Sequence, residues 1–147
     1  MGLDRWRDAR EAFEAVLSRH PQHSQARFNL GVALDGLGDH RGAADAYREA
    51  AAGQPHNAEI LFRIGTMHAR YGRWADAEEA YEQVLARDPR HVLSHFNLGQ
   101  VAERRGDGGR AVSHYRAVAA SEGADSDAAA LRAEAQRAID RLERGGR

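Results

Sequence analysis

Eight histidines are the side chains of this sequence best suited to metal binding or proton transfer. His91 and His95 are four residues apart, one helical turn, and His20 and His23 flank a proline. A catalytic zinc ion usually has three protein ligands, and neither pair has a Cys or Glu at a matching spacing. We therefore interpret the histidines as scattered structural residues and expect no metal site and no cofactor.

Two further patterns could carry chemistry, and neither predicts an active site. Gly36, Gly38 and Gly42 superficially resemble a phosphate-binding loop, but no strand precedes them, and the same turn returns at Gly72 and Gly106. No Ser-His-Asp set and no carboxylate pair stands out from the charged helix faces, which are typical solvated surfaces. The sequence therefore predicts a protein that is not an enzyme.

Composition excludes several classes of function. The 21 basic and 22 acidic residues are interspersed and give a net charge of −1, so no electrostatic field attracts nucleic acid. The chain has no lysine for a Schiff base and no cysteine for disulfides or thiolate ligands. No apolar run approaches the ~20 residues that span a bilayer, and the first residues carry acids where a secretory signal would be apolar. We expect no membrane insertion and a cytoplasmic location.

A period of 34 residues organises the chain. Six sets of side chains recur at this interval: Ala9, Ala43, Ala77, Ala111; Phe13, Tyr47, Tyr81, Tyr115; Val16, Ala50, Val84, Val118; Gly31, Gly65, Gly99; Gly38, Gly72, Gly106; and Pro21, Pro55, Pro89. A fixed period of this length is typical of stacked helical repeats.

Apolar periodicity and breakers predict the individual helices. The first has Ala9, Phe13 and Val16 on one stripe with charged residues opposite. Prolines, glycine turns and the predicted N-caps Ser24 and Asn57 delimit the others. The expected helices cover residues 4–19, 24–35, 40–52, 58–70, 74–86, 92–104, 110–120 and 126–144.

These sets resemble the tetratricopeptide repeat (TPR), a helix–turn–helix unit of 34 residues. The resemblance implies an all-α fold: a right-handed α-solenoid of antiparallel helix pairs forming a single domain, residues 1–147. We expect a half repeat at residues 1–23 and complete repeats at 24–57, 58–91 and 92–125. Residues 126–147 depart from the pattern and predict a capping helix and tail, apolar on one side only.

The resemblance also implies function, because repeats of this family act mainly as platforms for peptides and other proteins. We expect the first helix of each repeat to line a concave groove that holds an extended peptide. The candidate binding residues are Gln25, Phe28, Asn29, Val32, Glu59, Phe62, Arg63, Thr66, Arg70, Phe96, Asn97, Gln100 and Arg104.

Three of these residues have specific predicted roles. By resemblance, Asn29 and Asn97 hold the peptide backbone, since an amide both donates and accepts. Arg63 would clasp an acidic side chain or a C-terminal carboxylate. Two other interpretations stay open: the phenylalanines belong to the core, or the asparagines only bond neighbouring backbone.

One specific family function does not fit. Chaperone-binding members clamp two carboxylates with lysines, asparagines and an arginine. The corresponding positions here hold Phe28, Val32, Arg63, Leu93 and Asn97, and the chain has no lysine. We do not expect it to bind chaperone C-terminal tails.

Two alternatives to a peptide-binding scaffold remain. The chain starts in the middle of a repeat, which suggests a substrate-recognition or regulatory fragment of a larger multidomain enzyme. The unpaired first helix also suggests a self-assembling module with weak self-association, because it would expose a face around Trp6, Ala9 and Phe13.

Overall fold

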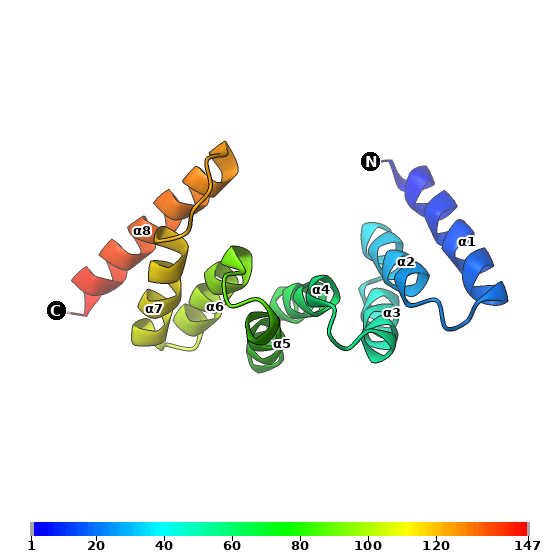
Figure 1. Cartoon of the computed structure of the whole chain (residues 1–147), viewed down its shortest axis with the longest axis horizontal. Coiled ribbons are helices and arrows are strands. Elements are labelled where there is room, and N and C mark those ends of the chain that lie inside the picture. Colours follow the sequence, from blue (N-terminus) through cyan, green and yellow to red (C-terminus); the bar gives the residue numbers. More distant parts are fainter. Residues whose placement is uncertain (1, 147) are drawn as a thin grey trace. The chain divides into compact units, whose positions relative to one another are not determined.

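The computed structural model describes residues 2–146, and all regular secondary structure in this range is α-helical (Figure 1). The helices are α1 (Leu3–Arg19), α2 (Ser24–Gly36), α3 (His40–Gly53), α4 (Ala58–Arg70), α5 (Trp74–Arg87), α6 (Val92–Arg104), α7 (Gly108–Ala119) and α8 (Ser126–Gly145). The prediction of an all-α fold is confirmed, and the predicted helix ends lie within two residues of those observed.

The chain divides into two compact units, Met1–Met67 and His68–Arg147. The first contains α1, α2, α3 and most of α4, and the second contains the end of α4 followed by α5 to α8. Single-domain organisation and the boundaries of the repeats stay predictions.

Glycine turns join the two helices of each pair, as predicted. Gly38, Gly72 and Gly106 have φ values of 82°, 70° and 77°, which is the left-handed region that only glycine adopts without steric cost. At the first turn the backbone N–H of Asp39 donates to the carbonyl of Leu34 over 2.9 Å, closing the end of α2. The repeated glycines therefore reverse the chain at equivalent places.

The first helices of the repeats are capped at three positions 34 residues apart. His23 Nδ1 accepts from the backbone N–H of Ala26 (3.1 Å), and His91 Nδ1 accepts from that of Ser94 (3.2 Å). Asn57 does the same for α4, as predicted. The prediction of Ser24 as an N-cap is wrong, because the ring nitrogen of His23 already fills that role one residue earlier.

The second helices of the repeats also share a capping position, and a side chain caps the helix at two of the three sites. Asp39 and Asp107 accept from the backbone N–H three residues ahead, over 2.9 and 3.0 Å. Arg73 occupies the same position before α5 and makes no side-chain cap. The capping by Asp107 lets α7 begin at Gly108 although glycine disfavours helix interiors.

Each unit has its own apolar core built on a tyrosine. In the first unit Tyr47 packs with Phe28, Ala43, Ile60 and neighbouring apolar residues. In the second unit Tyr115 packs with Phe96 and with the buried face of α8, which consists of Ala135, Ala138 and Ile139. The predicted capping helix therefore covers apolar side chains of α6 and α7, and Figure 1 shows α8 beside α7.

The first helix is more covered than predicted. Trp6 packs its ring against Gly36 of α2 so closely that a Cβ atom there would overlap it. Ala9 and Phe13 are also half-buried, because α1 uses this face to pack on α2. The exposed large apolar side chains of α1 are instead Leu3 and Val16, which are 57% and 37% exposed.

Replacing Arg73 by Asp should stabilise the protein. The backbone of Arg73 (φ −84°, ψ 68°) nearly matches that of the capping residue Asp39 (φ −82°, ψ 73°), so an Asp can reach the backbone N–H of Asp76. We expect a gain of about 1 kcal/mol and a rise of about 2–4 °C in Tm, measured by thermal melting. The control is Arg73→Ala, which removes the same side chain without adding a cap; equal Tm values for the two variants would contradict the prediction.

Candidate functional site

In the first unit, α2 places the predicted residues in two different environments. The ring of Phe28 is 7% exposed and lies 5.5 Å from that of Tyr47, so it belongs to the core, and Val32 is half-buried against the same core. Gln25 Nε2 donates to Asn29 Oδ1 over 3.3 Å at the surface. The polar contacts that α2 can offer a peptide therefore come from Gln25 and Asn29.

The α4 residues of the same unit pair among themselves. Arg63 Nε lies 3.4 Å from Glu59 Oε1, and both side chains are largely exposed. The hydroxyl of Thr66 donates to the backbone carbonyl of Phe62 over 3.0 Å. A surface ion pair of this kind contributes ~1 kcal/mol or less, so it does not prevent Arg63 from exchanging Glu59 for another carboxylate.

In the second unit Asn97 is held by a neighbouring helix. Its Nδ2 donates to the hydroxyl of Tyr81 over 3.1 Å. Asn29 is the equivalent residue two periods (68 residues) earlier. Its surroundings differ, because the position matching Tyr81 there is Phe13, which has no hydroxyl. Asn97 is thus oriented by the structure, and its amide oxygen remains available to accept a bond.

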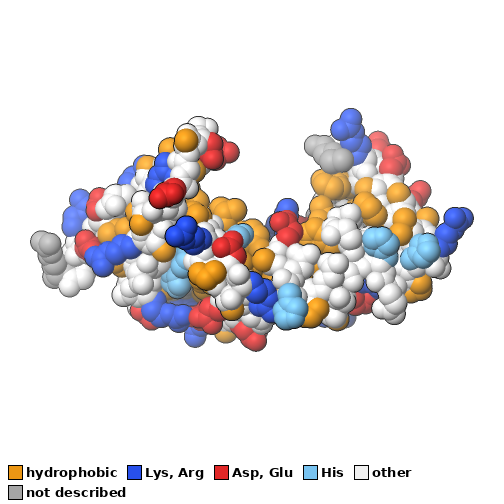
Figure 2. Space-filling view, in the orientation of Figure 1, with side chains coloured by type: hydrophobic (Ala, Val, Ile, Leu, Met, Phe, Trp, Pro, Cys, Tyr) orange, Lys and Arg blue, Asp and Glu red, His pale blue; other side chains and the backbone are white. Residues whose placement is uncertain are grey.

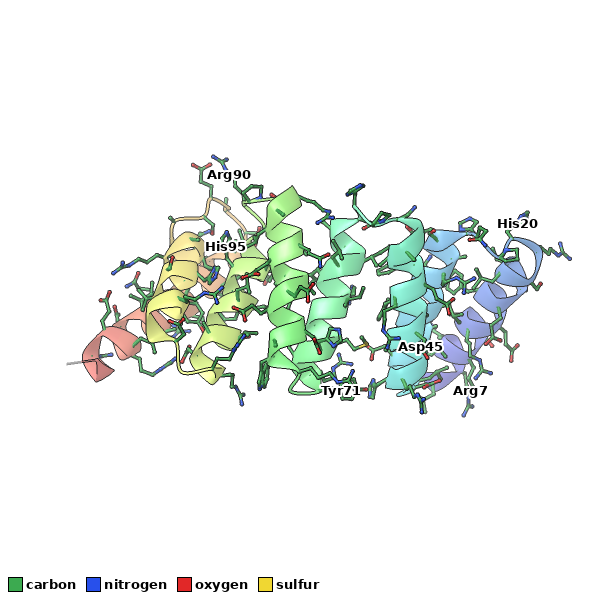
Figure 3. The ribbon with its side chains drawn as sticks, turned by 90° about the horizontal axis from the view of Figure 1, so that it is seen from below. Arg7, His20, Asp45, Tyr71, Arg90 and His95 are labelled. Carbon is green, nitrogen blue, oxygen red and sulfur yellow. The ribbon has the colours of Figure 1, made fainter. Side chains whose placement is uncertain are left out.

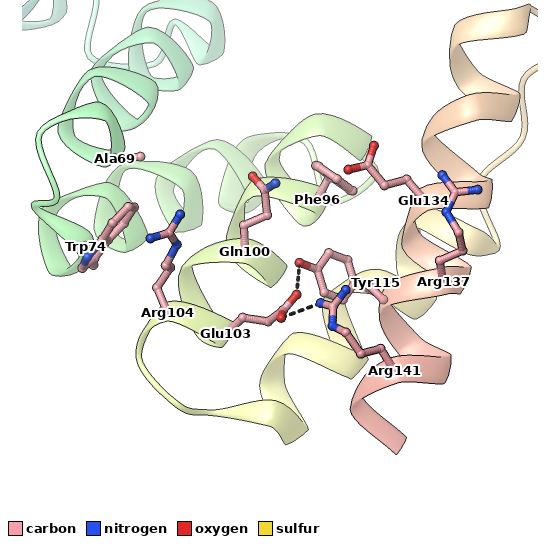
Figure 4. A pocket seen from close by; sticks show the side chains of 11 residues that line it. Ala69, Trp74, Phe96, Gln100, Glu103, Arg104, Tyr115, Glu134, Arg137 and Arg141 are labelled. Atoms are coloured by element: carbon pink, nitrogen blue, oxygen red, sulfur yellow. Dashed lines mark hydrogen bonds and ion pairs between the residues drawn. The ribbon is translucent and has the colours of Figure 1, made fainter. Parts of the chain in front are cut away.

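A pocket of about 810 Å³ lies within the second unit (Figure 4). Its lining comes from α4 to α8: Ala69, Trp74, Phe96, Gln100, Glu103, Arg104, Tyr115, Glu134, Arg137, Ala138 and Arg141. Of the predicted site residues, the structure brings Phe96, Gln100 and Arg104 together here.

Two interactions fix the walls of this pocket. The guanidinium of Arg104 lies 5.3 Å from the ring centroid of Trp74, a cation–π contact. Glu103 accepts from the hydroxyl of Tyr115 over 2.7 Å and from Arg141 over 2.6 Å, as the dashed lines in Figure 4 show. Burial, aided by the bond to Glu103, raises the pKa of Tyr115, so this hydroxyl remains protonated and donates.

The pocket residues on α8 were not predicted as a site. Glu134, Arg137, Ala138 and Arg141 follow an i, i+3, i+4, i+7 spacing, which places them on one helical face. The sequence shows this shared face. Because α8 departs from the repeat, the sequence analysis predicts only a capping helix there and no binding site. In the structure α8 is both a cap and a wall of the pocket.

His95 and His114 form a bonded pair between α6 and α7. His95 Nε2 lies 2.9 Å from the carbonyl oxygen of Pro89, which can only accept, so the neutral ring keeps its proton on Nε2. His114 Nδ1 then donates to His95 Nδ1 over 3.1 Å. Figure 3 shows His95 beside the loop that carries Arg90.

Charge on the surface is mixed in sign. Figure 2 shows acidic and basic side chains interspersed on the visible face of each unit. In the second unit Glu78 pairs with both Arg105 and Arg110, and Arg110 also pairs with Glu82 over 2.9 Å. Within residues 2–146 no group of three or more His, Cys, Asp or Glu side chains could hold a metal ion. None of the described helices is long and apolar enough to cross a membrane.

The helix pairs, their glycine turns and the 34-residue recurrence define a helical-repeat protein, and comparison identifies the family. The tetratricopeptide repeat family matches residues 1–58, 34–73 and 62–129. The chain belongs to this family, as the sequence resemblance predicted. Comparison with curated protein sequences gives no match.

Solved structures with the same fold include two bacterial proteins. The type III secretion chaperone SycD of Yersinia enterocolitica, solved with a peptide of the translocator YopD, has a TM-score of 0.77 and 10% identity over 84% of this chain and 94% of SycD. A crystal structure of MamA has a TM-score of 0.72 and 18% identity over 95% of this chain and 81% of that one.

A fragment of MamA from Desulfovibrio magneticus RS-1, running from residue 41 to the end, is also similar. Its TM-score is 0.70 and its identity is 23% over 78% of this chain. The chain spans 64% of the length of that fragment. At these identities the likeness establishes the TPR fold, and the partner of this chain follows from none of the three structures.

The histidine pair should make stability depend on pH. Burial lowers the pKa of His114, with further lowering by His95 and Arg110 against the opposing effect of Glu82 and Glu78. A lowered pKa contributes stability that is present above the unfolded-state value of about 6.5 and is lost as pH falls through the folded-state value.

We therefore expect His114→Gln to cost more stability at pH 7.5 than at pH 5. At the lower pH the wild type has lost the contribution of the neutral His114, so the difference between the proteins shrinks. Urea unfolding at both pH values measures it. A difference that stays constant or grows towards pH 5 would count against this account of the pair.

Proposed function

We propose that this protein is a non-enzymatic interaction scaffold whose first helices bind an extended peptide or partner segment. The observation that carries this proposal is the position of Phe96, Gln100 and Arg104. These three residues, expected to line a concave surface, border an open pocket of about 810 Å³. A pocket lined by exposed arginines and by the amide of Gln100 suits a peptide, which offers polar backbone groups and polar side chains.

The chemistry of the pocket also favours binding over catalysis. Burial raises the pKa of its tyrosine, Tyr115, so that hydroxyl stays protonated and donates to Glu103 rather than accepting a proton. Glu103 has both oxygens engaged, by Tyr115 and Arg141, so it is not poised to accept a substrate proton. Tyr115, Glu103 and Arg141 therefore stabilise the wall of the pocket through their bonds to one another.

The similarity to SycD supports the proposal. That protein shares the fold over most of both chains and was solved with a peptide of its translocator. Two expectations from the sequence stay predictions: that the chain is a substrate-recognition or regulatory fragment of a larger enzyme, and that it is cytoplasmic.

Self-association is the second candidate, and the observation that favours it is the exposed apolar surface of α1. No residue of α1 is fully buried, and Leu3 and Val16 are exposed on it. A second copy could cover these side chains. Sedimentation at tens of micromolar separates this candidate from a monomeric scaffold.

Binding to an array of overlapping peptides tests the proposal that the protein is a peptide-binding scaffold. We expect the triple variant Asn29→Ala, Arg63→Ala, Asn97→Ala to bind array peptides about tenfold more weakly than wild type, equivalent to about 1.4 kcal/mol. The amides would lose their bonds to peptide backbone and the arginine its carboxylate partner.

The matched control carries three substitutions on the second helices: Arg41→Ala, Glu79→Ala and Ser113→Ala. These side chains are exposed on α3, α5 and α7, and we expect their removal to leave binding unchanged. Thermal melts confirm that both variants are folded. Equal binding by wild type and the first variant would exclude the predicted groove residues.

A further inference from the structure

We infer that the pocket of the second unit is a receptor for an acidic side chain of a bound peptide, with its carboxylate held by Arg104 and Arg137. The inference rests on the proposed function and adds the chemical class of the partner. It assigns the recognition of charge to Arg104 on α6 and Arg137 on α8, whereas the sequence analysis assigned it to Arg63 on α4.

Pairing inside the pocket leaves two of its three arginines for a ligand. Arg141 is neutralised by Glu103, which also accepts from Tyr115. Arg104 contacts the ring of Trp74, and within the described residues neither Arg104 nor Arg137 forms an ion pair with a carboxylate. The pocket therefore presents positive charge that the protein itself has not balanced.

The geometry of Arg104 suits a carboxylate. A guanidinium held over an aromatic ring still has N–H groups in its own plane that can donate to another acceptor. Trp74 thus restricts the orientation of Arg104 while leaving these donors available for a bidentate bond. Gln100, one helical turn before Arg104, adds an amide donor to the same wall.

Arg137 faces the pocket from α8, across from Arg104 in Figure 4. Glu134 lies one turn before it on the same face and opposes an incoming acid. Arg104 and Arg137 carry two positive charges and Glu134 one negative charge, so the net charge of these three side chains is +1. The pocket therefore favours one carboxylate, and Glu134 limits how strongly it is held.

Apolar contact is a minor part of the recognition. Phe96 is 8% exposed and Tyr115 2% exposed, because both rings are already packed in the core. They offer only an edge to the short stem of an Asp or Glu side chain. Charge therefore decides which peptides enter this pocket.

The source of the carboxylate is a side chain rather than a chain end. A chain end with an acidic last residue carries two carboxylates, whereas Arg104, Arg137 and Glu134 together leave only one positive charge to balance them. A peptide can then continue past the pocket on either side of its acidic residue.

The test uses an array of paired 12-residue peptides, acetylated and amidated, whose members differ only by Glu or Gln at the central position. We expect wild type to bind the Glu member of a pair about tenfold more tightly. Arg104→Gln with Arg137→Gln should abolish this preference, so that the Glu and Gln members of a pair bind equally. Glu134→Gln should enlarge the preference severalfold, since it removes the opposing charge, and added salt should reduce it.

Arg90→Gln with Arg144→Gln is the matched control. It removes the same charge from exposed positions outside this pocket, and the Glu preference should persist. A preference that survives in the Arg104/Arg137 variant, or that is lost equally in the control, overturns the inference. Stronger binding of Gln peptides with a free C-terminus would assign the pocket to chain ends instead, which also overturns it.

Failure of the inference can be told from failure of the proposed function. If wild type binds array peptides without a preference for Glu, the scaffold function stands and the acidic receptor does not. If wild type binds no peptide of the array, both are excluded. Melting curves of each variant establish that the substitutions leave the second unit folded.

Discussion

Close contact between a glycine and a tyrosine ring is the constraint on which both units depend. A Cβ atom on Gly31 would lie 2.7 Å from the ring of Tyr47, and one on Gly99 would lie 2.6 Å from that of Tyr115. These distances leave no room for a larger side chain, because the rings are buried and cannot move aside cheaply. The contact brings the two helices of a pair together and seats the tyrosine at the centre of each core.

The same contact has a functional consequence in the second unit. Because the ring of Tyr115 is fixed against Gly99, its hydroxyl is held where it meets Glu103, and Glu103 in turn meets Arg141 of α8. The wall of the pocket is therefore an extension of the core. Arg104 also lines this pocket, in cation–π contact with Trp74.

The pocket arises where the repeat pattern ends. Its α8 wall carries charged residues that have no counterpart in the 34-residue recurrence, so they are free of the constraint that packing imposes on repeated positions. A helix that covers the last repeat must be apolar on one side, and its remaining surface can be specialised. Here that surface supplies Arg137 and Glu134 to the mouth of the pocket.

The sequence by itself determined the helices, the positive-φ turns at Gly38, Gly72 and Gly106, and the family, because turns and apolar stripes depend on residues within a few positions of one another. The pairing of Asn97 with Tyr81, the burial of Phe28 and Phe96, and the convergence of Arg104 with Arg137 were decided only by tertiary structure. Each of these depends on how one helix packs on another, and helical spacing alone does not specify which side chain a residue will meet across that contact.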